Sequence, residues 1–206
     1  MKKVILGIAV SSAMVLATNV CAGPYVVASL GKSQIESDFE IDGFPDVYQS
    51  AKDTDTFLSI GFGYMVDKNF SVEVAYNHFG EANDSIISDG INTLYLETDI
   101  SSFSVAAQGS VFFGDALSIV ARVGAERWDG GFDVNMNGID VDDGDDSGVD
   151  LFYGVGISYA LSKRLSLAAR YDIHKMDASD TLSVSDVKVD FDVDIKVFSL
   201  GAQLTF

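Results

Sequence analysis

Short stretches in which apolar side chains alternate with small or polar ones recur along residues 25–206. In residues 56–66, for example, Leu58, Ile60 and Phe62 share one face. A period of two is typical of a β-strand with one apolar face. The same pattern predicts eight strands, at 25–33, 56–66, 70–79, 101–113, 117–128, 149–161, 165–174 and in a last stretch ending at Phe206.

The connections between these stretches alternate in length. Three are short, at 67–69, 114–116 and 162–164, and four are long, at 34–55, 80–100, 129–148 and 175–196. Tight turns on one side and long loops on the other are typical of an outer-membrane barrel, and an even number of strands lets the sheet close. We therefore expect an all-β fold, an eight-stranded antiparallel up-and-down transmembrane β-barrel with short periplasmic turns and long extracellular loops.

A soluble β-sandwich also has alternating strands, so it is the main alternative fold. Its inward face would carry large apolar residues. Here the face opposite the apolar one carries glycines and scattered charges, with glycines at Gly61, Gly63, Gly154, Gly156 and Gly201. Aromatic residues near the strand ends, at Tyr64, Phe70, Phe113, Tyr159 and Phe206, resemble the girdle of a transmembrane barrel. The apolar face is therefore expected to meet lipid.

The first 22 residues read as a secretory signal. Lys2 and Lys3 precede an apolar stretch at 4–16, and Val20 and Ala22 place small side chains at −3 and −1 of a cleavage site. The apolar stretch is too short to span a bilayer as a helix. We expect cleavage after Ala22, which leaves residues 23–206 as one barrel domain. A lipoprotein anchored through Cys21 is the alternative, although Thr18 to Val20 fits a lipobox poorly.

Composition narrows the function classes. The formal net charge is −18, and loss of the two N-terminal lysines makes it more negative, so nucleic acid is not an expected partner. Cleavage also removes the single cysteine, which excludes disulfide and thiol chemistry. We expect no cofactor.

Residues 25–34, the eight-strand plan and the ending Leu204-Thr205-Phe206 resemble the transmembrane domain of OmpA and related small barrels. That resemblance implies insertion by the barrel-assembly machinery, which reads the terminal Phe206. It also implies a monomer surrounded by outer-membrane lipid and lipopolysaccharide. Nothing follows Phe206, so we expect no periplasmic cell-wall-binding domain.

Alternation places a set of polar residues in the lumen, whose width in an eight-stranded barrel just suffices for side chains. The set comprises Glu73, Arg122, Glu126, Arg170 and Asp172, together with Gln108 and Tyr25. Since unpaired buried charges are costly, Glu73, Arg122, Arg170 and Asp172 are expected to form an ion-pair network. Such a network either fills the barrel or gates a narrow ion path.

Inside the long connections the alternation continues, but the two faces exchange their character. Positions with outward parity, meaning those in step with the outward face of the strand, carry polar residues there, as at Asp190, Asp192 and Asp194. The apolar residues with inward parity are Ile35, Phe39, Ile41, Leu94, Leu96, Ile100, Trp128, Phe132, Val134, Met136, Val187, Val189, Phe191, Val193 and Ile195. The pattern predicts strands that continue past the membrane around a small apolar core.

Two candidate chemical sites are weak. Residues 133–138 resemble the start of a calcium loop, but Gly144 stands where that loop needs a glutamate. A solvated acidic loop is therefore the preferred interpretation, and we expect no metal site. His78 and His174 are the only histidines, and no nucleophile is spaced to work with either.

The sequence therefore predicts a non-enzymatic outer-membrane barrel with a structural or surface-interaction role. The external ligand, if any, is not indicated. A narrow pore for ions or small solutes is the alternative, and a lipid-modifying enzyme is a weaker one.

Overall fold

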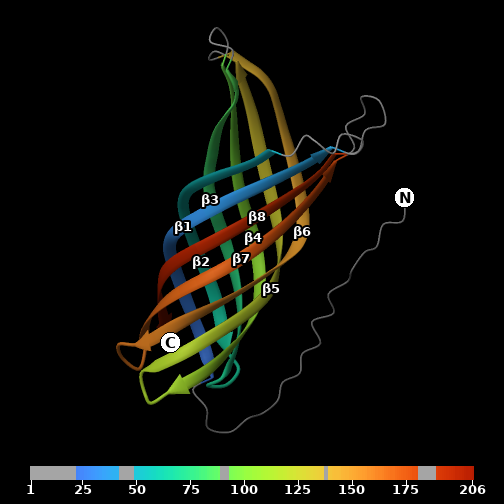
Figure 1. Cartoon of the computed structure of the whole chain (residues 1–206). Helices are drawn as coiled ribbons and strands as arrows, with labels where there is room; N and C mark the ends of the chain where they lie inside the picture. Colours follow the sequence, from blue (N-terminus) through green and yellow to red (C-terminus); the bar gives the residue numbers. More distant parts are fainter. Residues whose placement is uncertain (1–21, 42–48, 89–92, 137–138, 181–188) are drawn as a thin grey trace, which may run out of the picture.

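The computed structural model describes residues 22–41, 49–88, 93–136, 139–180 and 189–206. Within these ranges the chain forms a closed barrel of eight antiparallel strands in chain order (Figure 1). The strands are β1 (Gly23–Ile41), β2 (Gln49–Met65), β3 (Phe70–Ser88), β4 (Thr93–Phe113), β5 (Leu117–Met136), β6 (Ile139–Ala160), β7 (Leu165–Asp180) and β8 (Val189–Thr205). The predicted fold class is confirmed. No helix in the described part of the chain is long and apolar enough to cross a membrane.

The three short connections are hydrogen-bonded turns at one end of the barrel. In the β2–β3 turn, Asp67 Oδ1 accepts from the backbone N–H of Asn69 at 2.6 Å and of Phe70 at 2.9 Å. In the β4–β5 turn, Gly114 has a φ of 72°, a left-handed conformation that glycine adopts without steric cost. These local contacts fix the register of each hairpin, which decides which side chains face inward.

The outward residues form an apolar belt around the barrel. Along the belt the alternation is as predicted: Leu58, Ile60 and Phe62 of β2 are exposed, whereas Gly61 and Gly63 on the opposite face are buried. The aromatic residues expected at the turn end are all exposed: Tyr64, Phe70, Phe113, Tyr159 and Phe206. The small inward glycines leave room for large side chains, since the ring of Tyr25 lies directly against Gly63.

The strands continue well past the apolar belt. They run for 16 to 22 residues, whereas about 9–11 residues suffice to cross a bilayer. Ile35, Ile100, Trp128 and Ile195 are buried, as the inverted parity predicts. The prediction of continuing strands with inward apolar residues is confirmed at these positions. The side chains of the other predicted inward residues, apart from the partly buried Val193, lie outside the described set.

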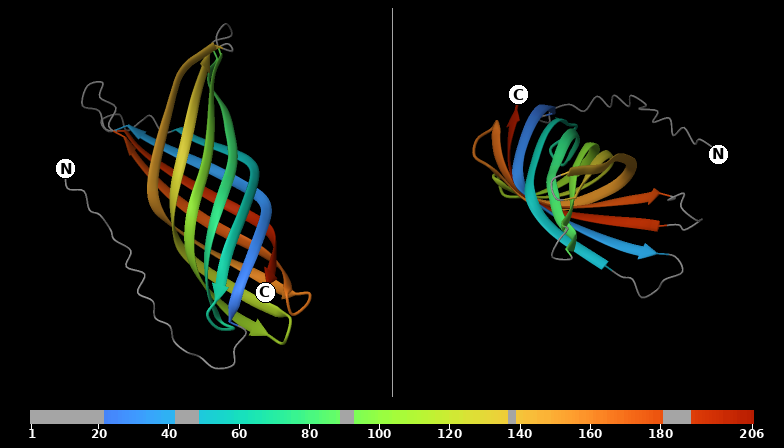
Figure 2. Two further views of the ribbon diagram at one scale, coloured as in Figure 1. Left: turned by 180° about the vertical axis from the view of Figure 1, so that it is seen from behind. Right: turned by 90° about the horizontal axis from the view of Figure 1, so that it is seen from above.

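The barrel divides into two lobes at the end opposite the short turns. Pairing of β2 with β3 stops at Leu58 and His78, and pairing of β6 with β7 stops at Phe152 and His174. The other six strand pairs continue further. One lobe therefore contains β7, β8, β1 and β2, and the other contains β3 to β6. Both lobes can be followed as diverging groups of strands (Figures 1 and 2). The sequence pattern did not predict this division.

The split between β2 and β3, one of the two seams between the lobes, begins at a β-bulge in β3. The register of β3 with β4 shifts between His78 and Glu81, and Gly80 within that interval has a φ of 88°. Asp55 of β2 lies against Gly80, and its Oδ2 accepts from the backbone N–H of Glu81 at 2.6 Å. A bulge bends its strand and increases the local twist. The bulge thus turns β3 away from β2 and toward β4.

Candidate functional site in the barrel lumen

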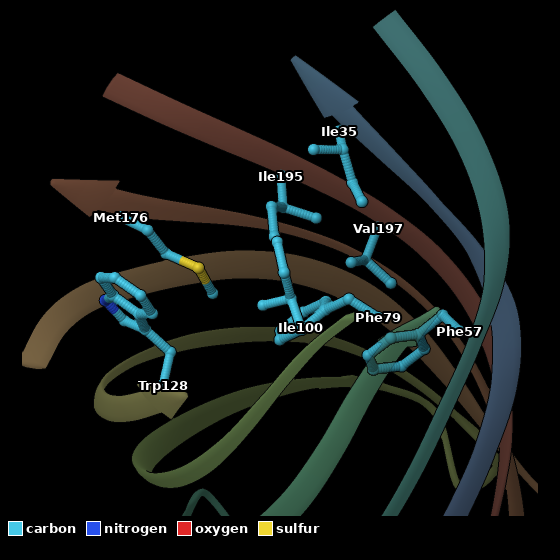
Figure 3. Packing of buried hydrophobic residues seen from close by; sticks show 8 residues of the cluster. All are labelled: Ile35, Phe57, Phe79, Ile100, Trp128, Met176, Ile195 and Val197. Atoms are coloured by element: carbon cyan, nitrogen blue, oxygen red, sulfur yellow. The ribbon is translucent and has the colours of Figure 1, made fainter. Parts of the chain in front are cut away.

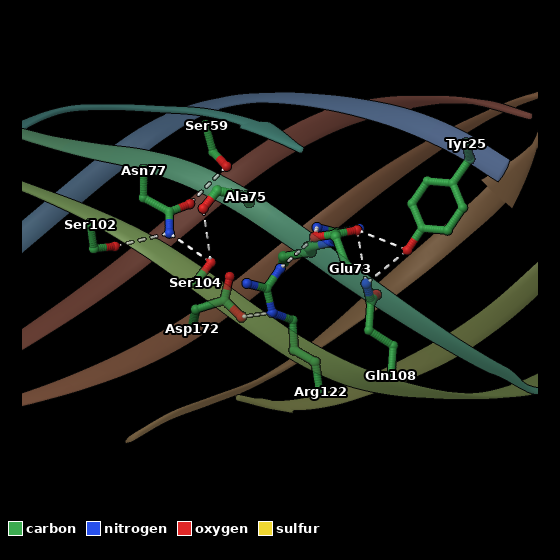
Figure 4. A network of polar contacts seen from close by, with 11 residues as sticks. Tyr25, Ser59, Glu73, Ala75, Asn77, Ser102, Ser104, Gln108, Arg122 and Asp172 are labelled. Atoms are coloured by element: carbon green, nitrogen blue, oxygen red, sulfur yellow. Dashed lines mark hydrogen bonds and ion pairs between the residues drawn. The ribbon is translucent and has the colours of Figure 1, made fainter. Parts of the chain in front are cut away.

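An ionic layer crosses the lumen, with the carboxylate of Glu73 at its centre (Figure 4). Glu73 Oε1 lies 3.4 Å from Nη1 of Arg122 and 3.3 Å from Nη1 of Arg170. Nε of Arg122 lies 3.4 Å from Oδ1 of Asp172. All four side chains are buried. The four residues expected to form ion pairs are therefore brought together, by β3, β5 and β7.

Neutral donors complete the surroundings of Glu73. Its Oε2 accepts from the hydroxyl of Tyr25 at 3.0 Å and from Nε2 of Gln108 at 2.8 Å. Gln108 Nε2 also lies 3.1 Å from the Tyr25 hydroxyl oxygen. Four donor groups thus converge on one buried carboxylate, an arrangement that offsets much of the cost of removing its charge from water.

A neutral polar layer lies next to the ionic one. The amide of Asn77 on β3 accepts from the Ser59 hydroxyl at 2.8 Å, and it donates to Ser102 and Ser104 of β4 at 3.1 Å each. Asn77 is almost fully buried, at 1% exposure. The sequence pattern did not predict this layer, because its inward serines differ in no way from those at other lumen positions.

Glu126 lies apart from the arginines. Its Oε1 is 2.7 Å from Nδ1 of His174, and its Oε2 accepts from the hydroxyl of Ser102 at 2.8 Å. The imidazole of His174 stacks on Phe152 with ring centroids 5.0 Å apart, and it meets Phe79 edge-on at 4.8 Å. The guanidinium carbon of Arg122 lies 4.9 Å from the ring centroid of Phe152 on β6. The five charged residues predicted for the lumen therefore form two groups, connected by an aromatic ring.

A hydrophobic cluster, which we call the plug, occupies the lumen at the root of the two lobes (Figure 3). It consists of Ile35, Phe57, Phe79, Ile100, Trp128, Met176, Ile195 and Val197, with Val193 packed against it. Ile35, Ile100, Trp128 and Ile195 had been predicted to face inward, and so had Val193. Phe57, Phe79, Met176 and Val197 had not, although all four have the inward parity of their strands. Following parity through every strand end would have identified them.

The opposite end of the lumen is open. A cavity of about 460 Å³ extends from the short turns to the ionic layer. Its mouth includes Asp67, Lys68 and Lys163, and its wall includes Gln108 and Arg170 of the ionic layer. The remaining wall is rich in small hydroxyl and amide side chains, including Ser118, Ser158, Ser166, Gln203 and Thr205. This end of the lumen is thus a vestibule, closed further in by the ionic layer and the plug.

The candidates for metal or acid–base chemistry are the stretch 133–138 and the two histidines. Among the described residues, no group of three or more histidine, cysteine or carboxylate side chains could hold a metal ion. The calcium-loop candidate at 133–138 lies outside the residues whose side chains are described. His78 is partly exposed, and its Nδ1 lies 3.8 Å from Asp99. His174 is buried, at 1% exposure, and its ring contacts Phe79 and Phe152.

The family model of the outer membrane protein beta-barrel domain matches residues 4–206 of the chain. A comparison with curated proteins found no significant match. Among solved structures, the chain is similar to the outer membrane protein OprG from Pseudomonas aeruginosa, with 14% identity and a TM-score of 0.54 over 90% of this chain and 99% of that one.

Two further structures share the fold. The N-terminal β-barrel domain of Pseudomonas aeruginosa OprF has 11% identity and a TM-score of 0.53, over 89% of this chain and 98% of that one. Neisserial surface protein A has 19% identity and a TM-score of 0.51, over 89% and 97%. At these identities the similarity establishes the barrel fold alone.

Proposed function

Since the chain belongs to the outer membrane protein β-barrel family, we propose that it serves a structural and surface-interaction role in the bacterial outer membrane, with a lumen closed to solutes. The observation that carries the proposal is the sequence of layers in the lumen. The four side chains Glu73, Arg122, Arg170 and Asp172 are at most 9% exposed, and Ile195 and Val197 of the plug are fully buried.

Energetics support a filled lumen. Opening a path through the ionic layer would separate Glu73 from both arginines, and a conducting path would also require the apolar plug to be wetted. Breaking a buried ion pair by removing one partner costs about 3–5 kcal/mol. The lumen of an eight-stranded barrel is only wide enough for its own side chains, so a solute has no room to pass them. The closed state therefore has the lower free energy.

Conductance of the purified protein in planar lipid bilayers tests the closed lumen. The wild type is expected to give no large, stable channels. The conductance of a matched pair of variants shows whether a leak arises at the plug. Ile195→Ser lies in the plug, and Leu200→Ser lies on the lipid-facing side of the same strand. Stable wild-type channels would instead establish the alternative, a narrow pore. The vestibule is the observation that favours this alternative, because it already carries water-accessible space up to Arg170.

The surface role is supported by the charge of the long connections. The segments 34–55, 80–100, 129–148 and 175–196 contain 25 of the 31 acidic residues and only four of the 13 lysines and arginines. Such a concentration of charge favours contacts with cationic partners. A deletion strain would be compared with its complemented parent for detergent sensitivity, adhesion and solute uptake. Loss of uptake alone would contradict a surface role.

We further propose that the protein lacks catalytic activity. The support is chemical: Nδ1 of His174 lies 2.7 Å from Oε1 of Glu126, Phe152 stacks on one face of the imidazole, and Phe79 makes a T-shaped contact with it. A lipid-modifying enzyme would need an accessible acid–base group beside a nucleophile. Mass spectrometry of lipid A from the deletion and overexpressing strains tests this; a modification that follows the dose of the protein would contradict it.

A role in the outer membrane also requires that the protein be exported and assembled there. The signal is cleaved after Ala22, and the intact mass of the mature protein tests the site, because a lipid on Cys21 would add mass instead.

Phe206 is 68% exposed at the end of the chain and serves as the assembly signal. Phe206→Ser should lower the yield of folded barrel in cells while leaving refolding in detergent unchanged. Equal losses in both assays would show that the phenylalanine acts only through stability.

A further inference from the structure

The vestibule ends at a buried arginine that is only partly engaged. Arg170 is 8% exposed and forms part of the cavity wall. Its Nη1 donates to Oε1 of Glu73 at 3.3 Å. In the described part of the chain, no other nitrogen of this guanidinium has a hydrogen-bond or ion-pair partner, and none of them is completely shielded from solvent. The remaining N–H groups of Arg170 are therefore available from the cavity.

Arg170 shares its carboxylate with a second arginine. Oε1 of Glu73 also lies 3.4 Å from Nη1 of Arg122. Arg122 has a further carboxylate beside it, since its Nε lies 3.4 Å from Oδ1 of Asp172, whereas Arg170 has no second one within the described residues. An anion bound on the cavity side would be to Arg170 what Asp172 is to Arg122.

Small inward residues leave room beside the guanidinium. Gly156 of β6 is paired with Arg170, and a Cβ at Gly156 would lie 3.1 Å from Cγ of the arginine, so the stem of the side chain rests against β6. The next inward residue of β7 toward the turns is Ala168, which also lines the cavity. The volume of about 460 Å³ falls within the range of roughly 300–1,000 Å³ that is usual for small-molecule sites.

Hydroxyl and amide groups surround the space between Arg170 and the turns. Ser158 of β6 is paired with Ser118 of β5, and Ser166 of β7 is paired with Gln203 of β8. All four side chains belong to the cavity wall. Hydroxyl and amide groups can both donate and accept hydrogen bonds. Such a wall fits a ligand that carries hydroxyl groups of its own.

Charge indicates the sign of the ligand. The residues that line the cavity include three cations, Lys68, Lys163 and Arg170, and two carboxylates, Asp67 and Asp115. Asp67 already accepts from two backbone N–H groups of its own turn. This positive excess lies within a chain of formal net charge −18. A guanidinium binds the oxygens of a phosphate or carboxylate through parallel hydrogen bonds.

We propose that the vestibule binds a small hydroxylated solute that bears a phosphate or carboxylate group, with Arg170 holding the anionic group. Sugar phosphates and sugar acids belong to this class. The solute enters from the side of the short turns and stops at the ionic layer, while the serines hold its hydroxyl groups. The site is separate from the proposed surface role, and it does not depend on whether the lumen conducts.

Titration calorimetry of the full barrel in nanodiscs of zwitterionic lipid tests the site. The probes are glucose 6-phosphate and glucuronate, with glucose as the uncharged comparison. The wild type should bind at least one of the two anions at millimolar concentration and bind glucose far more weakly. Arg170→Gln should weaken binding of that anion by at least about tenfold. Arg127→Gln, at a side chain that is 67% exposed on the outer surface, should leave it unchanged.

A second pair of variants leaves the ionic layer intact. Ala168→Met fills the cavity next to Arg170 and should also weaken binding by at least about tenfold, whereas Ala169→Met points to the lipid side of the same strand and should bind as the wild type does. If Arg170→Gln does not fold, this pair decides. Failure of both anions to bind the wild type, equal binding of glucose, or equal binding by the two members of either pair would overturn the proposal.

Discussion

Nδ1 of His174 on β7 lies 2.7 Å from Oε1 of Glu126 on β5, across the lumen, and the two side chains are only 1% and 0% exposed. The pair lies where the ionic layer ends and the plug begins, since Phe79 of the plug contacts the imidazole edge. Polar and apolar parts of the lumen are therefore joined through this histidine.

Removing the imidazole should destabilise the barrel more than neutralising its partner. His174→Ala leaves the Glu126 carboxylate buried with Ser102 as its remaining donor and is expected to cost about 3 kcal/mol. Glu126→Gln keeps an acceptor oxygen opposite Nδ1 and should cost about 1 kcal/mol. Urea unfolding in lipid vesicles measures both. His78→Ala, at the partly exposed histidine, is the control, and an equal loss there would contradict a special role for the buried pair.

Glu73, the carboxylate that both arginines share, should contribute more to the free energy of unfolding than its neutral donors do. Glu73→Gln removes the carboxylate that Arg122 and Arg170 share and leaves Asp172 as a charged partner of Arg122. It is expected to reduce the free energy of unfolding by about 3–5 kcal/mol. Gln108→Ala removes a neutral donor and should cost about 1 kcal/mol. The same unfolding assay compares the two. A smaller effect for Glu73→Gln than for Gln108→Ala would show that water already screens the layer.

The glycine that accommodates Tyr25 should not tolerate a methyl group. A Cβ at Gly63 would overlap the tyrosine ring, so Gly63→Ala is expected to cost about 1–3 kcal/mol. Gly109 has no described atom within 4 Å of its Cβ position, and Gly109→Ala should change stability by less than about 0.5 kcal/mol. The heat-induced mobility shift on gels reports unfolding of both variants. Equal midpoints would mean that Tyr25 can move aside.

Trp128 is the single tryptophan of the chain and lies in the plug, so its fluorescence reports on the packing there. Ile195→Ala should leave a cavity, cost about 2–5 kcal/mol and shift the emission to longer wavelength. Leu200→Ala, on the same strand but facing outward, exchanges contact with lipid and should leave the emission unchanged. A red shift in the control alone would place Trp128 outside the packed plug.

Asp55 should make stability depend on pH in the acid range. The backbone N–H groups of Glu81 and Thr56 donate to its carboxylate and hold its pKa below the ordinary value. A carboxylate with a lowered folded-state pKa stabilises the fold above its unfolded-state pKa, and this contribution is lost as the pH falls through the folded-state pKa.

The unfolding free energy of the wild type should therefore exceed that of Asp55→Asn by a constant amount above about pH 5, and the difference should shrink below about pH 4. Asp115→Asn, in an exposed turn, controls for the loss of a surface charge. A wild-type advantage that grows on acidification would contradict this role of Asp55.

Alternation along the chain determined much of this protein. A period of two assigns every residue of a strand to one face, and only a closed sheet can satisfy the backbone beside eight outward apolar faces. Parity gives the strand count, the inward positions of Glu73, Arg122, Arg170 and Asp172, and the inversion that buries Trp128 and Ile195. The short turns follow from the lengths of the connections.

Parity states which way a side chain points, but not its height in the barrel or its neighbours across it. Those depend on the stagger between strands, and only the tertiary structure decided them. It placed Glu126 with His174 and not with an arginine, and it joined Phe57, Phe79 and Met176 into the plug. It also divided the barrel into two lobes, because the bulge at Gly80 and the end of pairing at Phe152 arise from contacts between strands, which no single strand's pattern records.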